Sequence, residues 1–191
     1  MRKVFLHINM SVDGFIEDAD REMDWHFVDE EFEEYINDVL RSIDGMIFGR
    51  VTHQLLAEYW PTAGSNPEAS SRQVEAARMM NSLPKYVISS GPYDTDWQNS
   101  HLISGDIAGA IRRLKDQPGK DIALFAGAGV SQTFMRLDLI DEYRIIVNPA
   151  LLGGGTPLFT PGQGKVKLDL LKVKTFDSGA VVLFYQPDAK E

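Results

Sequence analysis

Short apolar runs typical of buried strands alternate with amphipathic runs typical of helices along most of this 191-residue chain. Residues 122–125, Ile-Ala-Leu-Phe, form an unbroken apolar run, which is typical of a central strand covered on both faces. The clearest helix follows Asp29, a good N-cap residue, and shows one apolar stripe at helical spacing: Phe32, Tyr35, Ile36, Val39, Leu40 and Ile43. This alternation predicts an α/β fold around a central sheet with flanking helices.

The other expected elements follow the same alternation until about residue 140. We expect strands over residues 4–9, 46–48 and 86–89, and helices over residues 52–60, 107–114 and 130–137. Asn66 and Pro67 have the residue types of a helix cap and a first helical position, so we expect a further helix from there to about Ser82. Residues 143–147, 166–176 and 181–185 look like strands without helices between them. They predict antiparallel strands at one edge of a mostly parallel sheet.

The net charge of −9 argues against a nucleic-acid surface and against a polybasic membrane patch. Most of the excess lies between Asp13 and Glu34, where eleven carboxylates face one base, Arg21, so the rest of the surface suits a phosphorylated ligand. The chain has no cysteine, and its four histidines are scattered without the spacing of a metal site. No apolar run is long enough for a signal peptide or a membrane span. We expect a soluble cytoplasmic protein without a metal, folded as one domain over residues 1–191.

Three expected strand ends carry residue types that suit phosphate groups. Gly49, Arg50, Val51 and Thr52 join a strand to a helix, and the planar guanidinium of Arg50 offers a fork that matches phosphate oxygens. Ser89 and Ser90 follow the next strand along the chain. Residues 126–130, Ala-Gly-Ala-Gly-Val, open a helix whose N-terminus favours a pyrophosphate, although neither a Rossmann fingerprint nor a P-loop is present. Because parallel strands share one carboxyl edge, these segments indicate a dinucleotide laid across that edge.

In order and spacing these segments resemble the NADPH-binding segments of the dihydrofolate reductase family. Residues 10–14, Met-Ser-Val-Asp-Gly, and residues 152–159, Leu-Gly-Gly-Gly-Thr-Pro-Leu-Phe, look more like the bacterial branch that includes the reductase domain of riboflavin biosynthesis. The resemblance covers nearly the whole chain. It implies the dihydrofolate reductase-like fold, with a mixed, mostly parallel sheet and antiparallel C-terminal edge strands, and NADPH as cofactor.

The resemblance also implies where NADPH would lie. Asn9 and Ile16 would flank the nicotinamide, together with Ile8. The residues implied along the adenosine and its phosphates are Gly49, Arg50, Val51, Thr52, Ser89 and Ser90. The residues implied along the pyrophosphate are Gly127, Ala128, Gly129, Val130 and Ser131.

Dihydrofolate reductases carry one carboxylate on their first helix that holds the pterin substrate. Counting back from the Gly-Arg-x-Thr segment, that position falls near Glu33, with Asp29 or Glu30 as alternatives if the loop differs in length. Asp13 is a second candidate catalytic carboxylate. The candidates for the wall of a pocket that takes a flat heterocycle are aromatic residues: Trp25, Phe27, Tyr59 and Trp60.

The expected activity is the transfer of hydride from NADPH to a small pterin- or pyrimidine-like heterocycle. One alternative is a ribosylaminouracil reductase of riboflavin biosynthesis, although the His-x-Glu and Pro-Cys-x-x-Cys motifs of an attached deaminase are absent from the sequence. Another is a module that binds NADPH or a nucleotide without catalysis. The Leu-Leu-Gly-Gly-Gly segment at residues 151–155 and the apolar C-terminal strands suit a twofold interface. The riboflavin-pathway relatives also pair, so we expect a homodimer.

Overall fold

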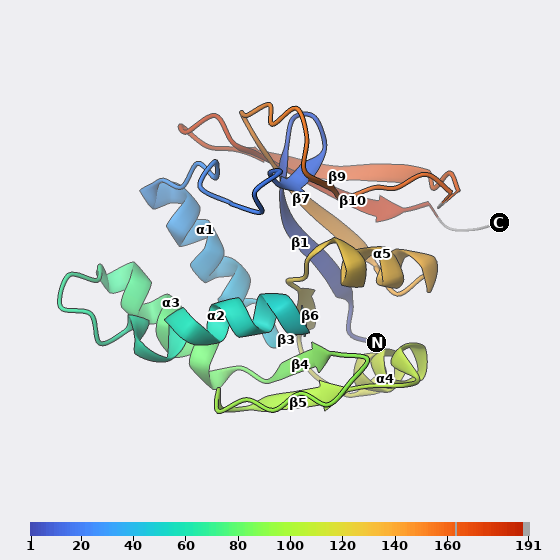
Figure 1. Cartoon of the computed structure of the whole chain (residues 1–191), viewed down its shortest axis with the longest axis horizontal. Coiled ribbons are helices and arrows are strands. Elements are labelled where there is room, and N and C mark those ends of the chain that lie inside the picture. The colour runs from blue at the N-terminus through green and yellow to red at the C-terminus, as the bar shows by residue number, and fades with distance from the viewer. Residues whose placement is uncertain (163, 189–191) are drawn as a thin grey trace.

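The central element is a sheet whose strands follow the order β5–β4–β3–β6–β1–β7–β10–β9 (Figure 1). The computed structural model describes residues 1–162 and 164–188, and within them this sheet has eight strands. Their bounds are β1 Val4–Ser11, β3 Ile43–Gly49, β4 Lys85–Ile88, β5 Ser100–Ile103, β6 Asp121–Leu124, β7 Glu142–Asn148, β9 Leu168–Thr175 and β10 Val181–Pro187. A separate antiparallel pair joins β2 (Phe15–Glu17) to β8 (Thr156–Pro157).

Most neighbouring strands run parallel, from β5 at one edge through to β7. The last two strands differ, because β10 pairs antiparallel with β7 and β9 pairs antiparallel with β10. The predicted change from parallel to antiparallel pairing near the C-terminus is therefore confirmed. Within the parallel part, Gly49 pairs with Ile88 and Ile47 pairs with Leu124. The carboxyl ends of β3, β4 and β6 therefore lie side by side.

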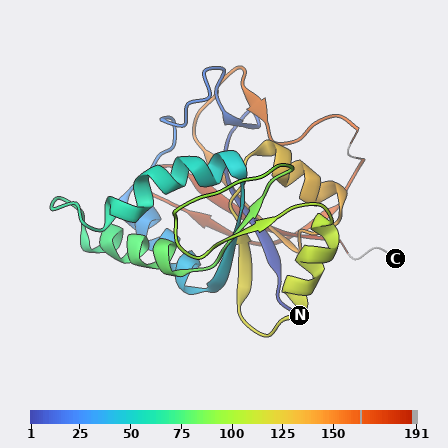
Figure 2. The same ribbon diagram turned by 60° about the horizontal axis from the view of Figure 1, so that its bottom comes forward.

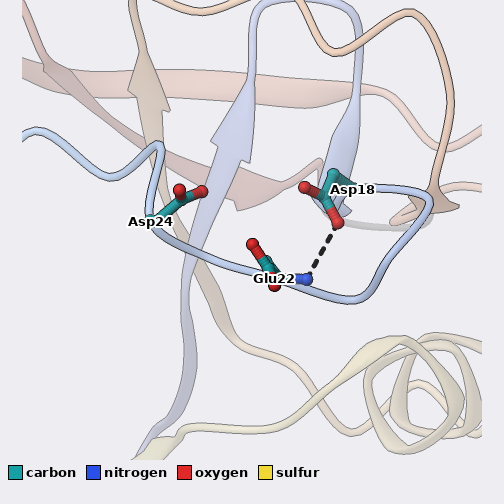
Figure 3. A group of neighbouring side chains, drawn as sticks. All are labelled: Asp18, Glu22 and Asp24. Carbon is teal, nitrogen blue, oxygen red and sulfur yellow. Dashed lines mark hydrogen bonds between the residues drawn. The ribbon is translucent and has the colours of Figure 1, made fainter.

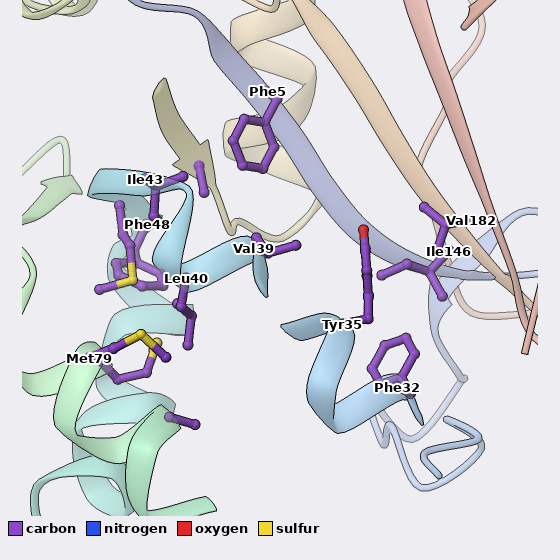
Figure 4. Packing of buried hydrophobic residues seen from close by; sticks show 14 of the residues in the cluster. Phe5, Phe32, Tyr35, Val39, Leu40, Ile43, Phe48, Met79, Ile146 and Val182 are labelled. Atoms are coloured by element: carbon purple, nitrogen blue, oxygen red, sulfur yellow. The ribbon is translucent and has the colours of Figure 1, made fainter. Parts of the chain in front are cut away.

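Helices cover both faces of the sheet (Figures 1 and 2). On one face lie α1 (Glu30–Arg41), α2 (Arg50–Ala63) and α3 (Ser71–Ser82), and on the other lie α4 (Ile107–Asp116) and α5 (Ala128–Arg136). Strand side chains alternate between the two cores, so Phe5 faces the α1 side while Leu6 faces the α5 side. Figure 4 shows how the α1 stripe, with Tyr35 and Val39, packs toward β1 and β7.

Helix α1 begins where the sequence predicts it. The Asp29 side chain accepts a hydrogen bond from the Phe32 backbone N–H at 2.7 Å, and a second from the Ser178 N–H at 3.0 Å. Ser178 belongs to the turn between β9 and β10, which is about 150 residues away along the chain. One carboxylate therefore caps the helix and fastens it to the antiparallel edge of the sheet.

The expected start of the third helix at Asn66 and Pro67 is wrong. The helix begins at Ser71, and Ser70 is its N-cap in a capping box with Gln73. The Asn66 side chain instead accepts from the Glu68 N–H at 3.0 Å and closes a local turn. Asparagine is favoured both at helix caps and in turns of this kind, and the reciprocal bonds of Ser70 and Gln73 decide between the two sites.

The sequence prediction also lacks three short strands. β5 is an edge strand with the sequence Ser-His-Leu-Ile, and His101 and Leu102 are exposed. Its pattern shows neither an unbroken apolar run nor a clear alternation, so it carries little strand signal. β2 and β8 together contain five residues and pair across a long sequence separation, which no local pattern reports.

The two contacts of Asp29 lead to a prediction with a matched control. Asp106 caps α4 through the Gly109 N–H at 2.9 Å, and the structure gives its side chain no second helix-to-turn contact among the described residues. We expect Asp106→Ala to lower the Tm by about 2–4 °C, as for an ordinary lost cap. Asp29→Ala should lower it by about twice as much, because the bond to Ser178 is also lost. Equal Tm values for the two variants in differential scanning calorimetry would contradict a stabilising role for the second bond of Asp29.

The hydrogen bonds that Asp29 accepts should also make its contribution to stability depend on pH. Hydrogen bonding from Phe32, and then from Ser178, lowers the pKa of Asp29. A lowered folded-state pKa means that the stabilisation is present above the pKa of an unfolded aspartate and is lost as the pH falls through the folded-state value. The Tm difference between wild type and Asp29→Ala should therefore shrink in acid.

Candidate functional site

A cavity of about 480 Å³ opens at the carboxyl edge of β3, β4 and β6. It is lined by Arg50, Ile88, Ser89, Ser90, Gly105, Ile107 and Val130. The predicted phosphate-binding segments after β3, β4 and β6 are thus brought together. The cavity also uses Gly105 and Ile107 at the start of α4, which the sequence reasoning missed. The Asp106 cap between them is a helix signal that could have directed attention to that helix end.

Two helices begin at this edge without a side-chain cap. The N-cap residues of α2 and α5 are Gly49 and Gly127, and neither helix has a side-chain hydrogen bond to its first turn. In contrast, Asp29, Ser70 and Asp106 cap α1, α3 and α4. Uncapped first-turn N–H groups, at the positive end of the helix dipole, are suited to an anionic ligand.

Glycine lets the two uncapped helix ends approach each other. A Cβ atom on Gly49 would lie 3.0 Å from Val130 Cγ2, closer than side chains normally pack, and a Cβ on Gly127 would lie 3.8 Å from Thr52 Oγ1. Ser131 is fully buried and donates to the Ala126 carbonyl at 3.1 Å, so its hydroxyl serves the turn itself. Val51 is largely exposed, and Gly129 is exposed. The polar groups that face the cavity are therefore Arg50, the two serines and the backbone.

His53 connects α2 to the segment that follows Ser90. Its ring is fully buried, with Nδ1 2.7 Å from the Tyr93 hydroxyl and Nε2 2.9 Å from Ser100 Oγ. Burial, with a smaller effect of Lys85, lowers the pKa of His53 to about 4. The imidazole is therefore neutral at physiological pH, and it holds the loop between β4 and β5 against the helix that carries Arg50.

A second cavity, of about 260 Å³, lies between α1, α2 and α3. It is lined by Val28, Phe32, Glu33, Ile36, Asn37, Tyr59, Trp60, Arg72, Gln73 and Ala76. The structure thus brings the predicted carboxylate Glu33 and the predicted aromatic wall residues Tyr59 and Trp60 to one cavity. Glu33 accepts a hydrogen bond from Gln73 Nε2 at 3.1 Å and lies 3.5 Å from Arg72 Nε.

The other two predicted pocket residues do not line this cavity. Trp25 stacks edge-on against His26, and its indole N–H donates to the Glu22 carbonyl at 3.2 Å. The Phe27 side chain is 44% exposed, while its backbone N–H donates to Asn148 Oδ1 at 3.0 Å. Of the two predicted alternatives to Glu33, Asp29 is engaged as the α1 cap and Glu30 pairs with Arg72 at 2.6 Å.

Aromatic rings continue from α1 to the end of β6. The His7 ring lies 5.7 Å from Tyr35 and 5.3 Å from Phe125, measured between ring centroids. Burial, and secondarily Arg144, lowers the pKa of His7 to about 3, so this imidazole is neutral. Nε2 of His7 and the Tyr35 hydroxyl are buried without a hydrogen-bond partner among the described residues.

The residues expected beside the nicotinamide occupy different surroundings. Asn9 Oδ1 accepts from Asn148 Nδ2 at 3.0 Å, which links the end of β1 to the end of β7. Ile16 is buried, and it packs with Ile8 in the core on the α5 side. Asn9 follows His7 on the α1 side of β1, because alternate residues share a face.

Asp13 lies outside the described lining of both cavities. Its carboxylate accepts from Ser11 Oγ at 2.7 Å, from the Gly153 N–H at 2.7 Å and from the Leu152 N–H at 3.1 Å. The bond from Ser11, followed by the bond from Gly153, lowers the pKa of Asp13 to about 2. The group is an anion at neutral pH and cannot donate a proton there. These contacts indicate that Asp13 holds the glycine-rich loop of residues 151–155 to the β1–β2 turn.

A group of carboxylates lies in the loop between β2 and α1; Asp18 is half-buried, and Glu22 and Asp24 are exposed. Single oxygen atoms of Asp18, Glu22 and Asp24 all lie within 4.8 Å of one another (Figure 3). Asp18 Oδ1 accepts from the Glu22 N–H at 2.8 Å and from the Asp20 N–H at 2.9 Å. These bonds account for the geometry of the loop, and nothing else in it points to a ligand.

Comparisons with known proteins agree on one family. Residues 2–182 match the family model of the RibD C-terminal domain. The uncharacterized protein YyaP of Bacillus subtilis strain 168 is 34% identical over 184 residues, which cover 96% of this chain and 94% of YyaP.

Among the helices of the described residues, none is long and apolar enough to cross a membrane.

Solved structures share the fold. A putative riboflavin biosynthesis protein from Shewanella sp. PV-4 aligns with a TM-score of 0.72 at 23% identity, over 98% of this chain and 99% of that one. Dihydrofolate reductase from Enterococcus faecalis, complexed with NADP(H), aligns with a TM-score of 0.65 at 11% identity, over 97% and 96% of the two chains. The predicted dihydrofolate reductase-like fold is thereby confirmed.

Proposed function

Because the chain belongs to the RibD C-terminal domain family, within the dihydrofolate reductase-like fold, we propose that it is an NADPH-dependent reductase of a small heterocycle. The observation that carries the proposal is the cavity at the carboxyl edge of the sheet. Arg50, Ser89 and Ser90 meet there beside two helix N-termini that have no side-chain cap. A ligand with several phosphate groups fits this combination of a permanent cation, hydroxyls and free N–H groups.

The residues present fit NADPH better than a nucleotide with a single phosphate. The uncapped ends of α2 and α5 suit a pyrophosphate, and Arg50 provides a separate cation for a further phosphate on the adenosine side. When bound, NADPH would supply the hydride. The chain itself would bind the phosphates and orient the cofactor along the sheet edge.

Glu33 is the proposed substrate-binding carboxylate. It lies in the second cavity, where it accepts from Gln73 and faces the aromatic wall that includes Trp60. A carboxylate there can accept hydrogen bonds from the N–H edge of a pterin- or pyrimidine-like ring and favours a protonated ring. We prefer Glu33 to Asp13 for this role, because the bonds of Asp13 are made to its own turn and to the glycine-rich loop.

A ribosylaminouracil reductase is the second candidate, and the family match to the RibD C-terminal domain favours it specifically. A module that binds NADPH without catalysis is the third. NADPH oxidation with a panel of pterins, pyrimidines and quinonoid compounds separates them. A binding module would bind NADPH and oxidise it with none of these compounds.

The outer strand of the antiparallel edge supports the proposal of a homodimer. Leu170, Leu171 and Val173 of β9 are each about half exposed, and among the described residues no strand pairs with the outer side of β9. Exposed apolar residues on an unpaired edge strand are unfavourable in a monomer, and a second copy of the chain would cover them.

The first prediction of the proposed function concerns cofactor choice. Arg50→Ala should weaken NADPH binding by about 10- to 100-fold and NADH binding much less, because the lost bonds are those to a charged phosphate. Titration of both cofactors by nicotinamide fluorescence measures this. Arg78→Ala, which removes an exposed cation on α3, is the control. Equal affinity of the wild type for NADH and NADPH would refute the assignment.

The second prediction concerns Glu33. Glu33→Gln should leave the fold and NADPH affinity intact and reduce kcat/KM by about tenfold or more, because glutamine keeps the size but not the charge. Glu34→Gln is the matched control, since Glu34 lies next in the helix and pairs with Arg41 at 2.8 Å instead of lining the cavity. If both variants lose activity equally, Glu33 does not bind substrate.

The third prediction concerns assembly. Light scattering should report about twice the 21.4 kDa of one chain at micromolar concentration. Leu171→Asp should shift the protein to the monomer, because it introduces a charge on the exposed face of β9. Val74→Asp, at an exposed apolar position on α3, should not. A monomeric wild type would exclude the dimer.

A further inference from the structure

The two cavities of the candidate site differ in charge. The described lining of the cavity at the sheet edge has one cation, Arg50, and no carboxylate. The cavity between α1, α2 and α3 has one cation and one carboxylate, Arg72 and Glu33. Arg72 Nη2 lies 2.6 Å from a Glu30 oxygen, and its Nε lies 3.5 Å from Glu33. Among the described residues that line the second cavity, Arg72 is the one base, and it is shared by two carboxylates, so the group of three is a net anion.

Other bases near α1 are also engaged. Lys174 pairs with Glu31 at 2.6 Å. Arg41 pairs with Glu34, with Asp38 and with Glu75 of α3, each at 2.8 Å. The segment that leads into α1, from Asp13 to Asp29, contains seven carboxylates and one base. A negatively charged ligand that approaches the second cavity along this segment therefore meets a predominantly acidic surrounding.

Two residues that line the second cavity also carry uncharged polar atoms, which are buried beside it. Trp60 Nε1 is a buried donor and Asn37 Oδ1 is a buried acceptor, and neither has a partner among the described residues. Asn37 is 1% exposed, and its amide N–H₂ donates to the Arg72 carbonyl at 3.1 Å, which fixes the orientation of the acceptor. Buried polar groups normally have partners, so this pair indicates a ligand with complementary donor and acceptor atoms.

The shape and walls of the cavity limit the ligand further. Its volume of about 260 Å³ holds a molecule of one or two rings. Phe32, Tyr59 and Trp60 provide flat apolar surface, and Glu33 provides one carboxylate edge. These features together suit a heterocycle that carries N–H and carbonyl groups and is neutral or protonated.

Resting on the function proposed above, we propose that the cavity between α1, α2 and α3 binds an unphosphorylated heterocycle, neutral or cationic, and discriminates against its phosphorylated form. A phosphate group would lose its hydration beside Glu33 and find Arg72 already paired. The two cavities therefore differ in the ligand groups that they select, with phosphates bound at the sheet edge and an unphosphorylated, neutral or cationic ring between the helices. By this selectivity, a phosphorylated ribosyl-pyrimidine would not be the substrate.

The test uses two matched pairs of ligands: pyridoxine with pyridoxine phosphate, and uridine with uridine monophosphate. Each is titrated into ¹⁵N-labelled protein, with and without saturating NADPH, and the indole N–H resonance of Trp60 is followed. Trp60→Phe identifies that resonance among the three tryptophans. We expect at least one unphosphorylated compound to shift it, with a Kd at least about tenfold below that of its phosphorylated form.

Two further variants test whether the pairing of Arg72 causes the discrimination against phosphate. The double variant Glu30→Gln with Glu33→Gln frees Arg72, so it should bind the phosphorylated member at least about tenfold more tightly than the wild type does. Glu34→Gln should behave as wild type. Equal or tighter wild-type binding of the phosphorylated member overturns the proposal, as does an unchanged preference in the double variant or a Trp60 resonance that no compound shifts.

NADPH titration in the same samples is a separate readout. If the protein does not bind NADPH but still prefers the unphosphorylated compounds, the proposed function is refuted and the proposed selectivity of the second cavity stands. NADPH binding without any charge preference would refute only the selectivity.

Discussion

The register of β3 between β4 and β6 determines where the polar groups of the candidate site lie. Gly49 ends β3 opposite Ile88, and Ile47 lies opposite Leu124, so the segments that follow the three strands leave the sheet together. Gly49 then allows Val130 to approach within a distance that any side chain would obstruct. Two uncapped helix ends consequently share one cavity. A shift of one residue in this register would separate Arg50 from Ser89 and direct alternate side chains to the opposite face.

Local sequence patterns predicted the elements whose residues carry a strong period or a clear cap. The α1 stripe and the caps Asp29 and Asp106 are where the patterns indicate. Asn66 was a wrong helix start because its residue type suits a turn equally well, and the alternative at Ser70 depends on a reciprocal bond with Gln73. β5, β2 and β8 were not predicted, because these short strands are defined by pairing with other segments of the chain and carry little local pattern of their own.

The part of the candidate site at the sheet edge could be predicted from the parallel topology and from the family resemblance. Both lead to Arg50, Ser89 and Ser90, and the structure brings them to one cavity. The second cavity depends on the packing of α3 against α1 and α2, which no residue spacing reveals. Glu33, Tyr59 and Trp60 were expected at a pocket and line this cavity, whereas Asn37 and Arg72 were not expected there. Trp25 and Phe27 were also expected at the wall, but they do not line the cavity.

Asn148 is almost completely buried at the end of β7, and it donates to Asn9 while it accepts from the Phe27 backbone. One side chain thus ties the central strand to the segment that enters α1, next to the Val28 edge of the second cavity. A cavity mouth that is fastened to the sheet loses little conformational entropy when a ligand arrives. The same tether would limit adaptation to ligands of other shapes, so it would favour affinity for one ligand shape over a broad choice of ligands.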